Sequence, residues 1–133
     1  MGSKTSPNCD TCVAEETNIH MFLYCYKIQE CVQIIYKMLF YFCNINFKDN
    51  LLKLLFFEIP KIDKKIQNTI CIIISSYISC IWYNREDINS IKYKLKAKII
   101  KEQKYHKLLL KEKMQDIFTE NYYNLDLNII NNL

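Results

Sequence analysis

Apolar residues recur at helical spacing in the first half of the chain. Between residues 28 and 42 they stand three or four positions apart with polar side chains between them, which predicts an amphipathic helix. Residues 51–57 form a shorter apolar helix that must end before Pro60, because the residue preceding a proline disfavours helical backbone. The buried face of the first helix is expected to contain Ile28, Val32, Ile35, Leu39 and Phe42.

A third apolar segment, residues 66–83, carries no charge and is nearly long enough to cross a bilayer. Ser75 and Ser79 lie one helical turn apart within it. The pattern therefore predicts a buried helix with one polar seam, and no membrane span. Asp63 is placed to cap the start of this helix.

The last periodic segment covers residues 88–118 and follows a candidate cap at Asp87. Its apolar stripe is incomplete and its other positions are mostly charged, which predicts a long basic helix projecting from the bundle. Residues 119–133 are rich in asparagine and are expected to fray. The incomplete stripe contains Ile91, Leu95, Ile99, His106, Leu109, Leu110 and Ile117.

Charge is concentrated in this basic segment. Nine of the 18 basic residues and two of the 14 acidic residues lie between residues 90 and 113, which leaves net charges of +7 there and −3 elsewhere. Such a segment indicates a partner that carries phosphates or anionic lipid. Lys, Asn, Ile and Tyr are abundant throughout, so AT-rich coding is an alternative source of part of the lysine excess. The single glycine, Gly2, excludes glycine-rich phosphate loops and dinucleotide fingerprints.

The chain has seven cysteines, and residues 1–8 lack the apolar core of a secretory signal. An odd cysteine count without a signal favours a reducing compartment, so we expect an intracellular protein of the nucleus or cytoplasm. Its cysteines are then thiols or metal ligands, not disulfides. Four of them fall on apolar helical faces and are expected to pack in the core: Cys31, Cys43, Cys71 and Cys80.

The remaining cysteines and one histidine have the spacing of a zinc site. Cys9 and Cys12 form a Cys-x-x-Cys step, which His20 and Cys25 follow. Zn²⁺ prefers four tetrahedral thiolate and imidazole ligands, and a site so filled is structural. His20 and Cys25 would lie about 140° apart on a continuous helix, so they converge only if the helix breaks between them or ends before Cys25. The alternative is chance placement in a cysteine-rich chain.

The same segment resembles a known family. It is similar to the zinc-binding region that follows the reverse transcriptase of non-LTR (LINE-type) retrotransposons, closely over residues 9–25 and loosely over residues 26–86. Tyr26 departs from the proline that often follows the last cysteine in that family. The matching residues are Cys9-Asp10-Thr11-Cys12, Glu16-Thr17, His20-Met21-Phe22, Cys25 and Ile81-Trp82-Tyr83-Asn84-Arg85.

This resemblance implies a C-terminal fragment that holds element RNA or target DNA during target-primed reverse transcription, next to the upstream polymerase of a parent polyprotein. It implies zinc as the cofactor, with ligand roles for Cys9, Cys12, His20 and Cys25. The aspartate motif of the polymerase and any endonuclease are absent from the chain, so no RNA-directed DNA polymerase activity is expected of it.

Seven lysines of the basic segment are the candidate phosphate contacts. Lysines that neutralise phosphates release counterions, which gives affinity without reading sequence. The seven positions spread around a helix, so the sequence selects no single binding face, and a solvated charged helix is the alternative. Tyr93 and Tyr105 could stack on bases, although aromatic residues at helical spacing more often pack. The candidates are Lys92, Lys94, Lys96, Lys98, Lys101, Lys104 and Lys107.

No catalytic group is expected. His106 has no nucleophile or carboxylate at a meaningful spacing, and the acidic pairs at 15–16 and 86–87 suit a knuckle flank and a helix cap. The first interpretation is thus a zinc-stabilised nucleic-acid-binding fragment. The second is a metal-free helical module whose Phe and Tyr faces bind a protein, with no nucleic-acid role.

The predicted fold class is all-α. The predicted divisions are a disordered leader (1–8), a zinc knuckle (9–25), a helical bundle (26–86), a long basic helix (87–118) and a frayed tail (119–133).

Overall fold

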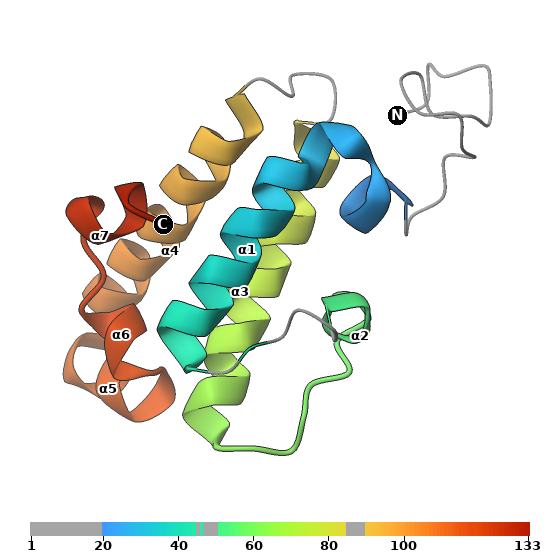
Figure 1. The fold of residues 1–133 in the computed structure, drawn as a ribbon. Coiled ribbons are helices and arrows are strands. Elements are labelled where there is room, and N and C mark those ends of the chain that lie inside the picture. The colour runs from blue at the N-terminus through green and yellow to red at the C-terminus, as the bar shows by residue number, and fades with distance from the viewer. Residues whose placement is uncertain (1–19, 45, 47–50, 85–89) are drawn as a thin grey trace.

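The computed structural model describes residues 20–44, 46, 51–84 and 90–133. Within these ranges the chain forms helices and no strands, which confirms the all-α prediction for that part of the chain (Figure 1). Most of the predicted zinc knuckle, the leader and the candidate cap Asp87 lie outside the described residues.

Three long helices build the core: α1 (Gln29–Cys43), α3 (Lys64–Tyr83) and α4 (Ile91–Leu110). Each packs against the other two. The expected face of α1 is buried as predicted, including Ile35 and Leu39, which have no exposed surface. The short helix α2 (Leu51–Leu55) ends before Pro60, also as predicted, and covers the core with Leu51 and Leu54.

Helix α3 begins where the sequence predicts. The Asp63 side chain accepts a hydrogen bond from the Lys65 backbone N–H at 2.8 Å, which satisfies a donor of the first turn. The helix is long and apolar enough to cross a membrane by length and composition, yet it buries Ile70, Ile73 and Tyr77 completely against its neighbours. This packing agrees with the predicted core helix.

The basic helix is part of the bundle and does not project from it. Helix α4 buries Ile91, Leu95 and Ile99 almost completely, in contact with α1 and α3. These three residues belong to the apolar stripe that the sequence indicates, and the stripe is sufficient to place the helix in the core.

The predicted continuous helix over 88–118 is also wrong in length. Helix α4 ends at Leu110, and the chain turns through η4 (Lys111–Lys113) into α5 (Met114–Ile117). A straight continuation to Phe118 would extend about 12 Å beyond the end of α4. The turn instead buries Met114 and Phe118 against the bundle. We call residues 111–119 the return segment. Two hydrogen bonds join it to α3: Asn68 Nδ2 donates to the Ile117 carbonyl at 2.9 Å, and the Thr119 N–H donates to Thr69 Oγ1 at 3.0 Å.

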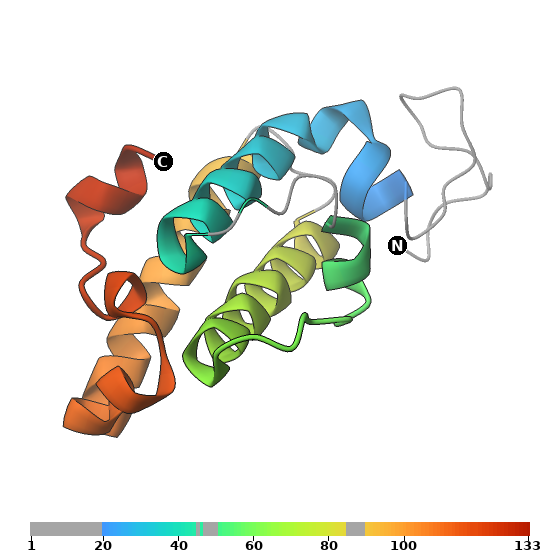
Figure 2. The same cartoon turned by 60° about the horizontal axis from the view of Figure 1, so that its bottom comes forward.

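The tail, residues 119–133, is folded and not frayed. It contains α6 (Glu120–Tyr123) and α7 (Leu127–Asn131), and both lie back along α4 (Figure 2). Buried Gln103 on α4 donates from Nε2 to the carbonyls of Tyr123 at 2.9 Å and Leu125 at 3.0 Å. The asparagines that suggested fraying alternate with three residues that are almost fully buried: Tyr122, Leu125 and Ile130.

The turn that ends α4 carries backbone strain at Lys111, whose φ of 52° and ψ of −128° favour glycine. We expect Lys111→Gly to raise the free energy of unfolding by about 1 kcal/mol, because relief of the strain exceeds the entropy cost of glycine. Urea unfolding followed by circular dichroism measures the change. Lys113→Gly is the matched control, since Lys113 has an ordinary φ of −65° and should lose stability. A loss of stability in both variants would contradict the strain at Lys111.

Candidate functional site

His20 and Cys25 are the two predicted zinc ligands within the described residues. His20 opens the π-helical turn η1 (His20–Tyr24), and the Cys25 N–H donates to the His20 carbonyl at 2.7 Å. Cys25 itself is extended, with φ −62° and ψ 130°. The helix therefore ends before Cys25. This is one of the two conditions under which the side chains of His20 and Cys25 could converge on one metal ion. His20 is 8% exposed and Cys25 is fully buried.

Long-range contacts hold this turn against the core. Tyr77 of α3 donates its hydroxyl to the Phe22 carbonyl at 2.6 Å. Gln29, at the start of α1, donates from Nε2 to the carbonyls of Leu23 at 3.1 Å and Cys25 at 3.0 Å. The turn is thus anchored by two of the three core helices, α1 and α3.

The other two predicted ligands, Cys9 and Cys12, lie outside the described residues. Within the described part of the chain, no group of three or more His, Cys, Asp or Glu side chains is arranged to hold a metal ion. The donor set fits the chemistry of a structural zinc site, because three thiols and one imidazole are ligands that Zn²⁺ prefers. The four-ligand site stays a prediction.

The cysteines assigned to the core behave as packing residues. Cys31, Cys43 and Cys80 are buried, as predicted, whereas Cys71 is only half-buried. Burial raises the pKa of Cys31 to about 12, with smaller contributions from Cys80 and Glu30, and it raises the pKa of Cys43 to about 12. Because the thiolate is the form that binds metals and attacks electrophiles, burial keeps these two thiols inert.

Alkylation tests this difference among the cysteines. In iodoacetamide at about pH 8, Cys71 should react much faster than Cys31 and Cys43, because their raised pKa values and burial suppress the thiolate. Mass spectrometry of peptides reads the rate at each site, and denaturant should remove the difference. Equal rates in the folded protein would contradict the buried placement of Cys31 and Cys43.

The structure divides the seven candidate lysines into two groups. Three of them contact α1 or the tail. Lys92 pairs with Glu30 of α1 at 2.9 Å, and the hydrogen bond to this carboxylate raises the pKa of Lys92. The other two contact the folded tail: Lys96 Nζ donates to the Asn131 carbonyl at 3.3 Å, and Lys107 Nζ lies 4.9 Å from the centre of the Tyr123 ring.

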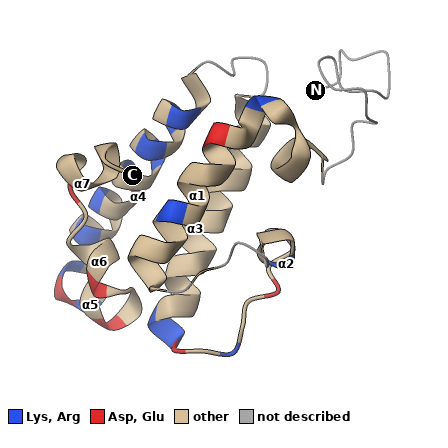
Figure 3. Cartoon of the chain, in the orientation of Figure 1, with Lys and Arg blue, Asp and Glu red and all other residues tan. Residues whose placement is uncertain are grey.

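The other four lysines, Lys94, Lys98, Lys101 and Lys104, follow the outer side of α4, and we call them the outer lysines. At about 100° per residue they fall within an arc of roughly 120°. Lys94, Lys101 and Lys104 are exposed, whereas Lys98, beside buried Ile91 on the helical wheel, is half-buried. Lys94 also donates to Asn84 Oδ1 at 3.0 Å. Figure 3 shows basic residues along the length of α4. The sequence could not select this subset, because the choice depends on where α1, α3 and the tail cover the helix.

His106 has a structural environment, as its sequence context suggested. Its Nδ1 lies 2.9 Å from the Tyr122 hydroxyl, and its ring centre lies 4.9 Å from that of Phe118. Tyr122 is fully buried, and this burial raises its pKa. The cluster joins α4 to Phe118 and Tyr122.

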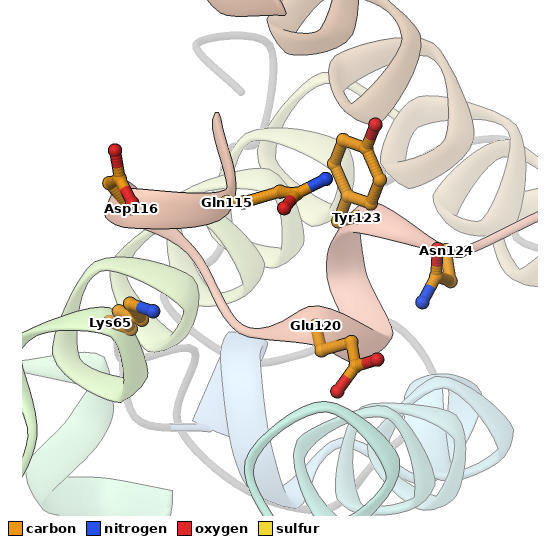
Figure 4. A pocket seen from close by; sticks show the side chains of 6 residues that line it. All are labelled: Lys65, Gln115, Asp116, Glu120, Tyr123 and Asn124. Carbon is orange, nitrogen blue, oxygen red and sulfur yellow. The ribbon is translucent and has the colours of Figure 1, made fainter. Parts of the chain in front are cut away.

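A polar pocket of about 340 Å³ lies between the start of α3 and the return segment. Sequence reasoning missed this pocket, because it forms only when the chain turns at Lys111 and the tail folds back. Figure 4 places the Asp116 and Glu120 carboxylates on different sides of it, so they do not form a paired acid–base site. The lining residues are Lys65, Gln115, Asp116, Glu120, Tyr123 and Asn124.

Comparisons with known proteins add no assignment. No family model, no curated protein and no solved structure matches this chain at a significant level. The resemblance of residues 9–25 to the retrotransposon region therefore remains a prediction that rests on the quoted motif alone.

Proposed function

We propose that this chain is a non-catalytic, zinc-stabilised nucleic-acid-binding module that contacts phosphates through the outer lysines of α4. The observation that carries the proposal is that these four lysines follow one side of α4, where Lys94, Lys101 and Lys104 are exposed, while the opposite side of the helix is buried. A row of lysines on a helix held by its neighbours matches a phosphate backbone by charge, and it requires no recognition of base sequence.

The rigidity of α4 supports the proposal. Leu95 and Ile99 have no exposed surface, and buried Gln103 bonds two carbonyls of the tail. A helix held in this way loses little backbone freedom when its lysines bind an anionic partner. The conformational entropy cost that opposes the electrostatic attraction is therefore smaller. A solvated helix that merely projects from a bundle lacks this advantage.

Zinc has a structural role in this proposal. Cys9, Cys12, His20 and Cys25 would hold the ion, and four protein ligands leave no open position for catalysis. When bound, the metal supplies folding free energy to the N-terminal part of the chain. The anchored turn at His20 and Cys25 supports this role, because it presents one half of the donor set on the core.

The resemblance of residues 9–25 extends the proposal to a biological setting. By that resemblance, the module is the C-terminal part of a retrotransposon reverse transcriptase, and it aids binding of template RNA or target DNA. Its partners are then the nucleic acid and the upstream polymerase domain of a parent polyprotein.

Salt dependence of RNA binding tests the outer lysines. If all four displace counterions from single-stranded RNA, the logarithm of the association constant should fall with the logarithm of salt concentration with a slope of about −3. The double variant Lys101→Gln, Lys104→Gln should reduce the slope by about 1.4, as measured by fluorescence anisotropy.

The matched control is Lys37→Gln, Lys53→Gln, which removes the same charge from exposed positions on α1 and α2. It should leave the slope unchanged. An association constant that does not change with salt concentration would contradict the assignment to α4. An equal reduction of the slope in the two double variants would also contradict it.

Metal content tests the zinc site. Purified protein should contain about one zinc per chain, and Cys12→Ser should lower this content and loosen residues 9–30. Elemental analysis measures the metal, and hydrogen exchange measures the loosening. Cys71→Ser, outside the predicted ligand set, should retain zinc. A metal-free protein whose exchange is unaffected by a chelator would contradict the site.

A protein-binding module is the second candidate function. Exposed aromatic side chains outside α4 favour it: Phe56 is 63% exposed, Phe57 48%, Trp82 45% and Tyr83 80%. Large exposed apolar side chains are typical of protein interfaces when they gather in one patch. Absence of zinc together with absence of RNA binding would favour this function over the first.

A further inference from the structure

Two tyrosines stand among the outer lysines of α4. Tyr93 is 63% exposed and Tyr105 is 57% exposed. At about 100° per residue, both positions fall on the outward side of the helix, within or beside the arc of the outer lysines. The sequence favoured packed roles for these rings, but the structure places neither of them in the core.

Each ring is supported along the helix while most of its surface stays accessible. Lys92 Nζ lies 5.2 Å from the centre of the Tyr93 ring. The Tyr105 ring meets the neighbouring His106 edge-on, with ring centres 5.9 Å apart. Such contacts restrict the rings without covering them, which lowers the entropy cost of a further contact.

Aromatic rings and lysines on the same face of α4 favour one class of nucleic-acid ligand over another. Lysines alone do not select a single strand, because they bind the phosphates of either form and release more counterions from the more densely charged duplex. Aromatic rings add affinity only where base faces are open, because the bases inside a duplex stack on one another. Stacking on exposed tyrosines is therefore a contribution that unpaired nucleotides alone can receive.

The spacing suits an extended strand. Tyr93 and Tyr105 are separated by about 18 Å along α4, and the four outer lysines occupy about 15 Å between them. A strand that follows the helix would meet a ring near each end and cations between, which is the usual arrangement of a single-strand binding surface.

We propose that the outer face of α4 binds single-stranded nucleic acid in preference to duplex, with unpaired bases stacked on Tyr93 and Tyr105 and phosphates on the outer lysines. The inference rests on the proposed function and deepens it by naming the strand state of the ligand. It concerns base faces and not base edges, so it implies little sequence preference.

The experiment compares two RNA probes of equal length, an unstructured oligouridylate and a duplex, at the same salt concentration. The unaltered chain should bind the single strand more tightly. Replacing both rings, in Tyr93→Leu, Tyr105→Leu, should weaken single-strand binding by about a hundredfold, at tenfold for each of the two stacked bases, and leave duplex binding unchanged. The double variant Tyr93→Phe, Tyr105→Phe keeps the rings and should retain the preference.

Phe40→Leu is the matched control, because Phe40 on α1 is also 57% exposed and lies away from the lysine row. It should leave both affinities unchanged. Unchanged single-strand affinity in the leucine double variant would overturn the stacking inference while lysine-dependent binding stands. Failure of the unaltered chain to bind either probe would overturn the proposed function itself, and with it the inference.

Discussion

Burial of the apolar side of α4 is the constraint on which the rest of the molecule depends. Ile91, Leu95 and Ile99 give this lysine-rich helix a place in the core beside α1 and α3. A helix with so many like charges is unfavourable on its own, because cations one turn apart repel one another. Hydrophobic burial offsets this repulsion and sets the rotation of the helix. The rotation in turn decides which lysines point outward.

The folded tail is the second determinant of the lysine surface. It is held by the amide of Gln103, which has 1% exposure and would be costly to bury without its two carbonyl partners. Because α6 and α7 lie along α4, Lys96 and Lys107 contact the tail. The same segment that completes the core thus narrows the candidate interface to the outer lysines and the two tyrosines beside them.

The two proposed sites differ in how they depend on the core. The turn that contains the proposed ligands His20 and Cys25 is held by hydrogen bonds from Tyr77 and Gln29, which involve no metal. The lysine face depends on how α4 packs against α1, α3 and the tail. Loss of zinc should therefore disturb the N-terminal part more than α4, and the two functions can be tested separately.

Local patterns were sufficient for much of this fold. The periodic face of α1, the Asp63 cap of α3 and the end of α2 before Pro60 follow from spacing and backbone preferences within a few residues. The turn at Lys111 and the buried tail could not be predicted from local patterns, because they depend on where α4 extends beyond the helices packed against it. The same holds for the interface: composition marks a basic segment, but only packing separates outward lysines from those held by Glu30 and the tail. Side-chain type is a local property, whereas exposure is decided by contacts between residues far apart in the chain.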